Sequence, residues 1–242
     1  MQIIGNTDVG RTRVANEDAF KFGKFDDGAC WAVVCDGMGG VHGGKIASST
    51  AIDIVSQKIV KCYNTSMNIN NIENLLLSSI TTANCVVYDR GSSDKDLEGM
   101  GTTIVAAIYK NGEVCIAHVG DSRAYIIKDG EIRLLTKDHS LVQEMLDMGQ
   151  ITETEFEHHP RKNIITRALG VAEKIEIEFD TVEFSKNDAL ILCSDGLSGL
   201  LEKNKMLDIY NNCDFNSLAD KYIEAANDNG GVDNITVVVM KG

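Results

Sequence analysis

The sequence contains little proline, few aromatic residues and no long apolar run. Of its 242 residues, one is proline, one is tryptophan and 6% are aromatic. No stretch approaches the roughly 20 apolar residues of a membrane-spanning helix. The N-terminal segment MQIIGNTDVGRTR has no apolar core like that of a secretory signal. We therefore expect a cytoplasmic protein that does not insert into a membrane.

Cysteine is present, but in no pattern that indicates a disulfide framework or a zinc site. The seven cysteines form no CxxC pair and are odd in number. Those that lie within or beside apolar runs are Cys30, Cys35, Cys85, Cys115 and Cys193. This usage is typical of buried, reduced thiols in a cytosolic protein.

The charge balance and the missing loop motifs exclude several classes of function. With 36 acidic and 23 basic residues, the formal net charge is −13, which opposes binding to nucleic acid or to an anionic membrane. The sequence also offers no basic groove and no aromatic platform for stacked bases. Neither a GxxxxGK[ST] loop nor a cysteine followed by x5-Arg occurs, so the sequence indicates no P-loop and no cysteine nucleophile.

Strand-like runs separated by tight-turn dipeptides fill the centre of the chain. The dipeptides between apolar runs are Asp27-Gly28, Asn111-Gly112 and Asp129-Gly130. Such dipeptides are the strongest short signal for a β-hairpin. Helices are expected over residues 47–62, 73–90, 202–211 and 215–228. Strands in the middle with helices outside them predict an α+β fold of packed antiparallel sheets flanked by helices.

Acidic residues stand at the edges of several apolar runs, each beside a turn signal. They are Asp36 in WAVVCDGMGG, Asp121 in IAHVGDSRA, Asp195 in ALILCSDGLSG and Asp233 in GGVDNITVVVM. Glu17 and Asp18, in RVANEDAF, precede a shorter run. A buried strand delivers its end residue to a fixed place, so these carboxylates can build one anionic pocket. Such a pocket needs cations, because uncompensated carboxylates repel one another and are costly to desolvate.

An all-oxygen pocket suits hard divalent ions such as Mg²⁺ or Mn²⁺. A lone Asp-Gly is more often a plain turn, but Asp36-Gly37 and Asp195-Gly196 both end apolar runs and precede helical sequence. Glycine at these positions lets the backbone carbonyl approach an ion. Two ions about 3.5–4 Å apart would activate a bridging water for in-line attack on phosphorus, without a covalent intermediate. The sequence therefore predicts a metal-dependent hydrolase of phosphate esters.

The phosphate must also be held against this anionic pocket. Arg13 lies four residues before Glu17, and its planar guanidinium suits two phosphate oxygens, so it is the predicted substrate-binding and catalytic arginine. Arg123, in GDSRA, is a weaker candidate, for which a structural ion pair is expected.

The leaving oxygen of a phosphate ester needs a proton, which imidazole commonly supplies near neutral pH. His42, in a glycine-rich loop, is the best-placed histidine, and a water on a metal ion is the alternative. Of the other histidines, His118 is expected in the core, His139 in a turn, and His158 and His159 in solvent.

One domain, residues 1–242, is expected, because the early strand at residues 32–35 and the late strands near Cys193 and Val237 must meet if their aspartates share ions. Long-range closure of the sheet would bring them together. Residues 140–165 break the strand pattern, since they are polar with one short amphipathic helix, and they predict an inserted, mobile segment.

A series of longer motifs runs along the chain in a definite order. They are TDVGRTRVANEDAF, VVCDGMGG, GMGTTIVAA, HVGDSRAY, LTKDHSLVQEMLDMGQI, ITRALG, LILCSDGL and DNITVVV. Over essentially its whole length the chain resembles the bacterial metal-dependent serine/threonine protein phosphatases of type 2C. The resemblance implies a four-layer α-β-β-α sandwich and hydrolysis of phosphoserine and phosphothreonine in proteins, reversing a serine/threonine kinase.

The resemblance also implies a set of site residues. Asp36, Asp195 and Asp233, with the carbonyl of Gly37, would bind two central Mn²⁺ or Mg²⁺ ions, and Asp36 would bridge them. The same motifs imply roles for further acidic residues. Glu17 and Asp18 would act directly or through metal-bound water, and Asp121 with Asp195 would form a weaker third-metal site. Residues 140–165 correspond to a flap beside the catalytic cleft.

The chain departs from the family pattern in its glycine-rich loop. Val41 stands where many members have histidine, and Lys45 stands where glutamate is common, so the resemblance does not decide whether His42 is the proton donor. Two alternative functions stay open: a catalytically silent binding module of the same fold, and a phosphatase of a small phosphorylated metabolite. A monomer is expected.

Overall fold

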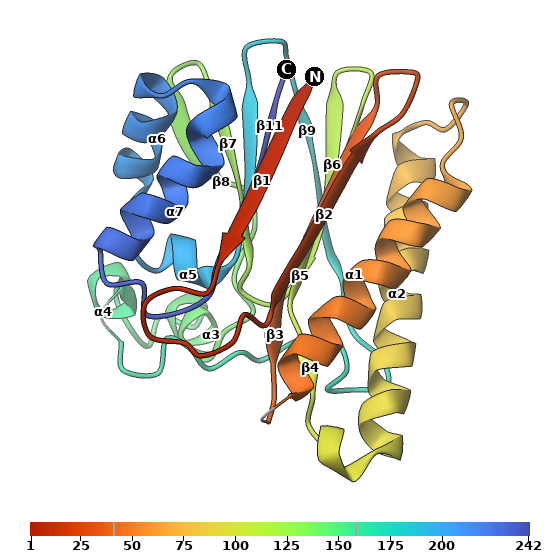
Figure 1. Cartoon of the computed structure of the whole chain (residues 1–242), viewed down its shortest axis with the longest axis vertical. Coiled ribbons are helices and arrows are strands. Elements are labelled where there is room, and N and C mark those ends of the chain that lie inside the picture. Colours follow the sequence, from red (N-terminus) through yellow and green to blue (C-terminus); the bar gives the residue numbers. More distant parts are fainter. Residues whose placement is uncertain (41, 158) are drawn as a thin grey trace.

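Two antiparallel sheets lie face to face at the centre of the molecule, and helices cover the outer face of each (Figure 1). The computed structural model describes residues 1–40, 42–157 and 159–242, with Glu157 described by its backbone alone. The predicted α+β fold, a four-layer sandwich of two antiparallel sheets between helices, is confirmed.

The two sheets share no strand. The first has the strand order β1-β11-β10-β7-β8. Its strands are β1 (Gln2–Asp8), β7 (Arg123–Lys128), β8 (Glu131–Leu134), β10 (Ala189–Cys193) and β11 (Ile235–Lys241). The second has the order β2-β3-β5-β6-β9, with β4 paired to β3. Its strands are β2 (Asp18–Lys24), β3 (Cys30–Met38), β4 (Gly101–Thr102), β5 (Ile104–Lys110), β6 (Glu113–Val119) and β9 (Glu178–Glu183).

The predicted hairpins join neighbouring strands. Asn111 and Asp129 have φ of 51° and 54°, in the left-handed region, and each is followed by a glycine with positive φ. Two-residue turns of this conformation match the twist of the strands they connect, and they link β5 to β6 and β7 to β8. Asp27-Gly28 lies in the longer loop between β2 and β3.

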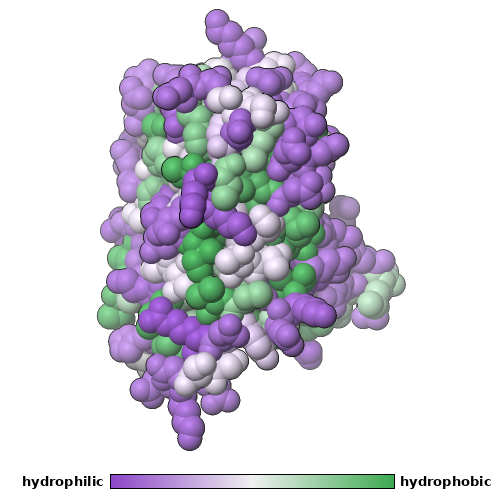
Figure 2. Space-filling view, turned by 90° about the vertical axis from the view of Figure 1, so that its right-hand side faces the viewer, coloured by the Kyte–Doolittle hydropathy of each residue, from purple (hydrophilic) through white to green (hydrophobic). Residues whose placement is uncertain are grey.

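Long helices form the outer layers (Figure 1). The second sheet is covered by α1 (Gly43–Cys62) and α2 (Ile69–Ser93), and the first by α6 (Lys203–Asn212) and α7 (Leu218–Asp228). The short elements are η1 (Lys95–Leu97), α3 (Leu141–Asp147), α4 (Glu153–Glu157), α5 (Asp195–Ser198) and η2 (Phe215–Ser217). Figure 2 shows the side of the molecule where α1 and α2 lie, which is largely hydrophilic with scattered apolar side chains, as is normal for a protein surface.

Three apolar layers hold the sandwich together. Between the sheets, Val34 of β3 packs in one cluster with Leu192 of β10 and Val238 of β11. Because side chains alternate between the two faces of a strand, the neighbouring residues of these strands face the helices instead. Ile108 of β5 lies in the cluster under α1 and α2, and Val237 of β11 lies in the cluster under α6 and α7.

The predicted meeting of early and late strands takes place across the sheet interface. β3 belongs to the second sheet, whereas β10 and β11 belong to the first, so the strands pack face to face rather than closing one sheet. Strands that pack face to face form no hydrogen bonds with one another. Sequence patterns that indicate strand pairing therefore do not reveal this contact. β3 also continues through Gly37 to Met38, and α1 begins only at Gly43.

One cysteine differs from the prediction of buried thiols. Cys85, in α2, is exposed, because a helix shows only one side to the sheet it covers. Cys62, at the end of α1, is also exposed. Cys30, Cys35, Cys115 and Cys193 are buried as expected, and all seven thiols are free. Within the residues described, no helix has the length and apolar content needed to cross a membrane.

The core under α1 and α2 is testable by truncation. Ile108→Ala removes a side chain with 0% exposure and should lower the free energy of unfolding by about 2–5 kcal/mol, through lost burial and a new cavity. Val60→Ala, at a side chain with 57% exposure in α1, is the control and should change it by no more than about 0.5 kcal/mol. Urea unfolding measures both values, and equal effects would contradict the assigned core.

Candidate metal centre

Two of the predicted acidic residues face each other on neighbouring strands. Asp18 begins β2, Asp36 lies near the end of β3, and the two are direct partners in the antiparallel register. Like charges in this position destabilise a sheet. Asp36 is nevertheless fixed there by its backbone, since its amide donates to Thr103 Oγ1 at 3.0 Å and its carbonyl accepts from the Thr103 amide at 2.8 Å.

The other sheet brings two more carboxylates to the same place. Asp195 is the first residue of α5, separated from β10 by Ser194 alone, and Asp233 precedes β11. The backbones of these two segments touch, because a Cβ on Gly196 would lie 2.0 Å from the carbonyl oxygen of Asn234. Only glycine fits at Gly196. Asp195 is close enough to Asp36 on the opposite sheet for its charge to raise the pKa of the Asp36 carboxyl.

Burial and mutual repulsion act together on these side chains. Burial, followed by the charges of Asp195 and Asp233, raises the pKa of Asp18 to about 7, despite hydrogen bonds from Thr236 and Ser194 that lower it. Burial, and then Asp18 and Asp195, raises the pKa of Asp36 well above its usual range. Each carboxylate is thus costly to ionise beside the others.

Asp121 joins the same electrostatic cluster from the turn between β6 and β7. Burial, and then the charge of Asp195, raises the pKa of Asp121 to about 8. Asp195 also has a raised pKa, from burial and then from Asp233. The structure therefore gathers the aspartates that the sequence analysis singled out.

Unpartnered oxygens show that the cluster suits a cation. Among the buried side-chain polar atoms that the structure describes, those without a hydrogen-bond partner are the Oδ1 atoms of Asp18, Asp121, Asp195 and Asn227. Three of these four belong to the acidic cluster. Buried polar groups nearly always have a partner, and carboxylate oxygens are the ligands that Mg²⁺ and Mn²⁺ prefer. The residues present fit a site for hard divalent ions.

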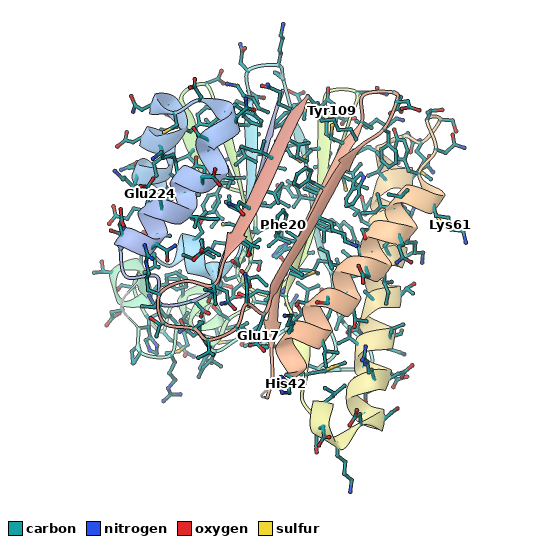
Figure 3. All side chains as sticks on the ribbon, in the orientation of Figure 1. Glu17, Phe20, His42, Lys61, Tyr109 and Glu224 are labelled. Atoms are coloured by element: carbon teal, nitrogen blue, oxygen red, sulfur yellow. The ribbon has the colours of Figure 1, made fainter. Side chains whose placement is uncertain are left out.

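Gly37 lies where a side chain cannot. A Cβ there would be 2.1 Å from the carbonyl oxygen of Gly44 at the start of α1, and 2.7 Å from that of Glu17. The glycine thus lets β3 pass close to α1 beside Asp36. Glu17 is half-buried at the same end of the sheets, where Figure 3 labels it near His42. Metal binding by Glu17 and by the Gly37 carbonyl stays a prediction.

Arg13 reaches the centre from the loop between β1 and β2. Its Nη2 donates to Asp233 Oδ2 at 2.7 Å, while 53% of its side chain stays exposed. That hydrogen bond first, and the charges of Asp195 and Asp36 as well, raise the pKa of Arg13. The guanidinium therefore lies at the open side of the cluster with donors left over.

The histidines differ from one another in their surroundings. His42 is exposed and precedes α1 as its N-cap residue, without a side-chain cap hydrogen bond. The neighbouring Val41 lies outside the described residues, as does His158, which was expected in solvent. His159 is partly buried. His118 is buried in β6 as predicted, with 5% exposure.

His139 lies in a loop, as predicted, but it is buried with 4% exposure. Together with His118 and Glu178 it forms a group whose ligand atoms lie within 4.8 Å of one another. This group does not fit a metal ion. His139 Nδ1 accepts from the Gly120 amide at 3.0 Å, so in the neutral ring the proton is on Nε2. The cation of Arg167 lies 3.4 Å from that Nε2 and 3.2 Å from Glu178.

Supporting polar residues were missed at the sequence level. Asn234 Oδ1 accepts from the Glu17 amide, and its Nδ2 donates to the carbonyls of Val9 and Ala15, which ties the Arg13 loop to Asp233. Ser194 donates to Asp18 Oδ2 at 2.7 Å. Both residues directly adjoin a predicted ligand in the sequence, which is the signal that could have identified them. The expected ion pair of Arg123 is confirmed, with Asp138 at 2.6 Å.

Comparison with known proteins identifies the family. The family model described as protein phosphatase 2C matches residues 10–238. The serine/threonine phosphatase stp of Listeria welshimeri is 41% identical over 236 residues, which cover 97% of this chain and 93% of that protein. The serine/threonine phosphatase of S. agalactiae has a TM-score of 0.92 at 36% identity, covering 100% of this chain and 99% of that one. The chain belongs to the protein phosphatase 2C family.

One further solved structure contains metal. The catalytic domain of the serine/threonine protein phosphatase PstP, in complex with two manganese ions, has a TM-score of 0.84 at 30% identity. The alignment covers 98% of this chain and 96% of that one.

The raised carboxyl pKa values predict how the metal-stripped protein responds to pH. Asp18 and Asp121 have folded pKa values of about 7 and about 8, above the unfolded value of about 3.9. The folded state therefore holds more protons, and its stability falls as the pH rises from about 6.5 to 8, by at most about 1.4 kcal/mol per pH unit and group. Unfolded histidines keep part of their protons up to about pH 7.5, whereas burial lowers the pKa of His118 and His139 in the folded state. These two histidines therefore oppose the fall in stability below that pH.

Thermal unfolding in the presence of a chelator measures this profile. Asp18→Asn removes one of the titrating groups and should flatten the profile. A wild-type melting temperature that rises with pH over the same window would show that the folded carboxyls are already ionised there.

Proposed function

We propose that the chain hydrolyses phosphoserine and phosphothreonine in proteins at a pair of Mn²⁺ or Mg²⁺ ions, without a covalent intermediate. Membership of the protein phosphatase 2C family makes it a protein phosphatase. The observation that carries the metal centre is the set of buried, unpartnered Oδ1 atoms of Asp18, Asp121 and Asp195. The manganese ions of the PstP catalytic domain support the same ion type.

The residues proposed to hold the ions come from both sheets. The central pair is assigned to Asp36, Asp195 and Asp233 with the Gly37 carbonyl, and a weaker third ion to Asp121 with Asp195. Glu17 and Asp18 act directly or through bound water. When bound, such ions supply a water of lowered pKa and stabilise the negative charge that develops on the phosphoryl oxygens.

The cysteines beside the centre support the non-covalent route. Burial raises the pKa of the Cys35 thiol, next to Asp36, and raises that of Cys193 to about 12. A thiol acts as a nucleophile only when it is deprotonated. These thiols stay protonated near neutral pH and are buried away from substrate, so attack by water is favoured.

Arg13 is the proposed phosphate ligand. Its exposed guanidinium already contacts Asp233, so a phosphate placed over the ions would meet its remaining donors in a charge-assisted geometry. His42, exposed at the start of α1, is the proposed proton donor to the leaving oxygen, with metal-bound water as its competitor.

Residues 1–242 are proposed to work as one catalytic domain, with residues 140–165 as a flap that tunes access. α3 and α4 lie in this segment. The proposed substrates are phosphoproteins made by a serine/threonine kinase. A monomeric state and a cytoplasmic location stay predictions.

Phosphate release from a phosphothreonine peptide by metal-stripped protein, with and without Mn²⁺, tests the proposed function. Wild type should release phosphate only with Mn²⁺, and Asp36→Asn should lower kcat at least about 100-fold, more than loss of an outer metal-site residue. Asp53→Asn, at an exposed carboxylate of α1 paired with Lys21, is the matched control and should leave turnover unchanged.

Activity of Asp36→Asn within about tenfold of wild type would remove Asp36 from the centre. Metal binding without peptide hydrolysis would favour the silent module, or a small phosphorylated metabolite if such a compound is hydrolysed instead.

The phosphate-binding role of Arg13 predicts an effect on KM. Arg13→Ala should raise KM about tenfold, the loss expected for one charged hydrogen bond, and should lower kcat less. Arg13→Lys keeps the charge but not the planar guanidinium, so its KM should lie between those of wild type and Arg13→Ala. Mn²⁺ affinity, measured by calorimetry, controls for indirect effects through Asp233. An unchanged KM in Arg13→Ala would contradict the assignment.

A further inference from the structure

The turn that carries Asp121 is held by one short loop on both of its sides. On the far side of Asp121, Arg123 makes a two-pronged ion pair with Asp138, at 2.8 and 2.6 Å. On the near side, His139 binds both polar groups of the Gly120 backbone. The Gly120 amide donates to His139 Nδ1 at 3.0 Å, and the His139 amide donates to the Gly120 carbonyl at 3.0 Å.

The position of the Asp121 carboxylate depends on this backbone. Its Oδ1 is buried and has no hydrogen-bond partner among the described residues, so neighbouring side chains do not anchor that atom. Gly120 has a φ of +106°, and a Cβ there would lie 2.6 Å from Thr103, so the turn has a conformation that only glycine adopts easily. Because peptide units are planar, fixing the Gly120 amide and carbonyl sets the direction in which Asp121 leaves the turn.

The surroundings of the His139 ring favour the tautomer in which Nδ1 accepts a hydrogen bond. Its Nε2 lies 3.0 Å from Glu178 Oε1, so the Nε2–H donates a hydrogen bond to this carboxylate and Nδ1 is left as an acceptor. His118 stacks on the ring at 4.8 Å between centroids. Burial, with His118 and Arg167, lowers the pKa of His139, which agrees with a neutral ring.

The same residue meets the base of the flap segment. The carbonyl of His139 accepts from the Thr166 amide at 2.8 Å, and the Leu141 amide donates to the Ile164 carbonyl at 2.9 Å. Both ends of residues 140–165 therefore join next to His139. The Asp121 turn and the base of this segment share one hydrogen-bonded support.

We propose that His139 is a positioning residue, which holds the Gly120 amide through Nδ1 and thereby places the Asp121 carboxylate for the weak third ion. This inference rests on the proposed function, in which Asp121 binds that ion. His139 touches neither substrate nor ion, and it acts through the turn.

Two substitutions separate the two hydrogen bonds of the ring. His139→Asn places an amide oxygen on Cγ, where Nδ1 stood, and so keeps an acceptor for Gly120 while losing Glu178. His139→Gln extends one atom further, so its amide can reach Glu178 but leaves the Gly120 amide without its acceptor. Mn²⁺ binding by calorimetry, with the metal alone as the probe, is the main readout, and Asp121→Ala defines the isotherm that lacks the weak ion.

His139→Gln should weaken the weak Mn²⁺ site about 10–100-fold, as loss of a supporting residue around a metal does, and leave the tight pair unchanged. His139→Asn should stay within about threefold of wild type. A merely structural role would affect both variants alike. The proposal would be overturned if His139→Gln and wild type gave equal isotherms, or if both variants lost the same affinity at the weak site. Loss of the tightly bound pair of ions would also overturn it.

A measurement on the wild-type protein needs no variant to fold. The Gly120 nitrogen should show scalar coupling to His139 Nδ1 across their hydrogen bond in ¹⁵N NMR. Its amide signal should move in the weak phase of a Mg²⁺ titration. Absence of the coupling, or an amide signal that stays still in the weak phase, would overturn the proposal.

These binding readouts do not depend on hydrolysis. A wild-type protein that fails to release phosphate but shows the predicted split between the variants would contradict the proposed function alone. Normal metal-dependent hydrolysis with no difference between His139→Gln and His139→Asn would contradict the positioning role alone.

Discussion

Buried carboxylates from both sheets lie near one another at one end of this sandwich, and their charges repel. Asp18 faces Asp36 across a strand pair, and the charge of Asp195, from the other sheet, acts on Asp36. Without cations, such an arrangement raises the pKa values of its carboxyl groups, so they stay protonated at a higher pH than ordinary aspartates do. In the proposed metal centre the same oxygens would serve as ligands to divalent ions, so the part of the fold that is least favourable without cations is also the part that fits them.

The surrounding fold makes this arrangement possible by fixing the backbone rather than the carboxylates. Glycine at Gly37 and Gly196 permits contacts that no side chain would allow. Asn234 ties the Arg13 loop to the segment before β11, and the apolar layer between the sheets sets their separation. The carboxylate oxygens are thus left unpartnered while the backbone around them is held in place, which is the preorganisation that a metal site requires.

The hairpins and the acidic residues of the cluster were predictable from local sequence. Turn dipeptides such as Asn111-Gly112 placed hairpins, because left-handed φ values restrict which residues can occupy them. Asp36 and Asp195 stood out because a carboxylate at the end of an apolar run is costly unless something binds it. Where local rules were insufficient, the predictions failed. Cys85 was assigned to the core, although it occupies the outer side of α2.

The hairpins, the long helices and the aspartates of the acidic cluster can be predicted from local sequence, because each depends on short-range backbone preferences or on the chemistry of one residue type. In contrast, three features follow from the packing of the folded chain: β3 meets β10 and β11 face to face, Arg13 pairs with Asp233, and His139 supports the Asp121 turn. These contacts join residues that are distant in the chain or on different elements. Their partners are chosen by how the sheets pack, and packing depends on the shape of the whole core rather than on any local pattern.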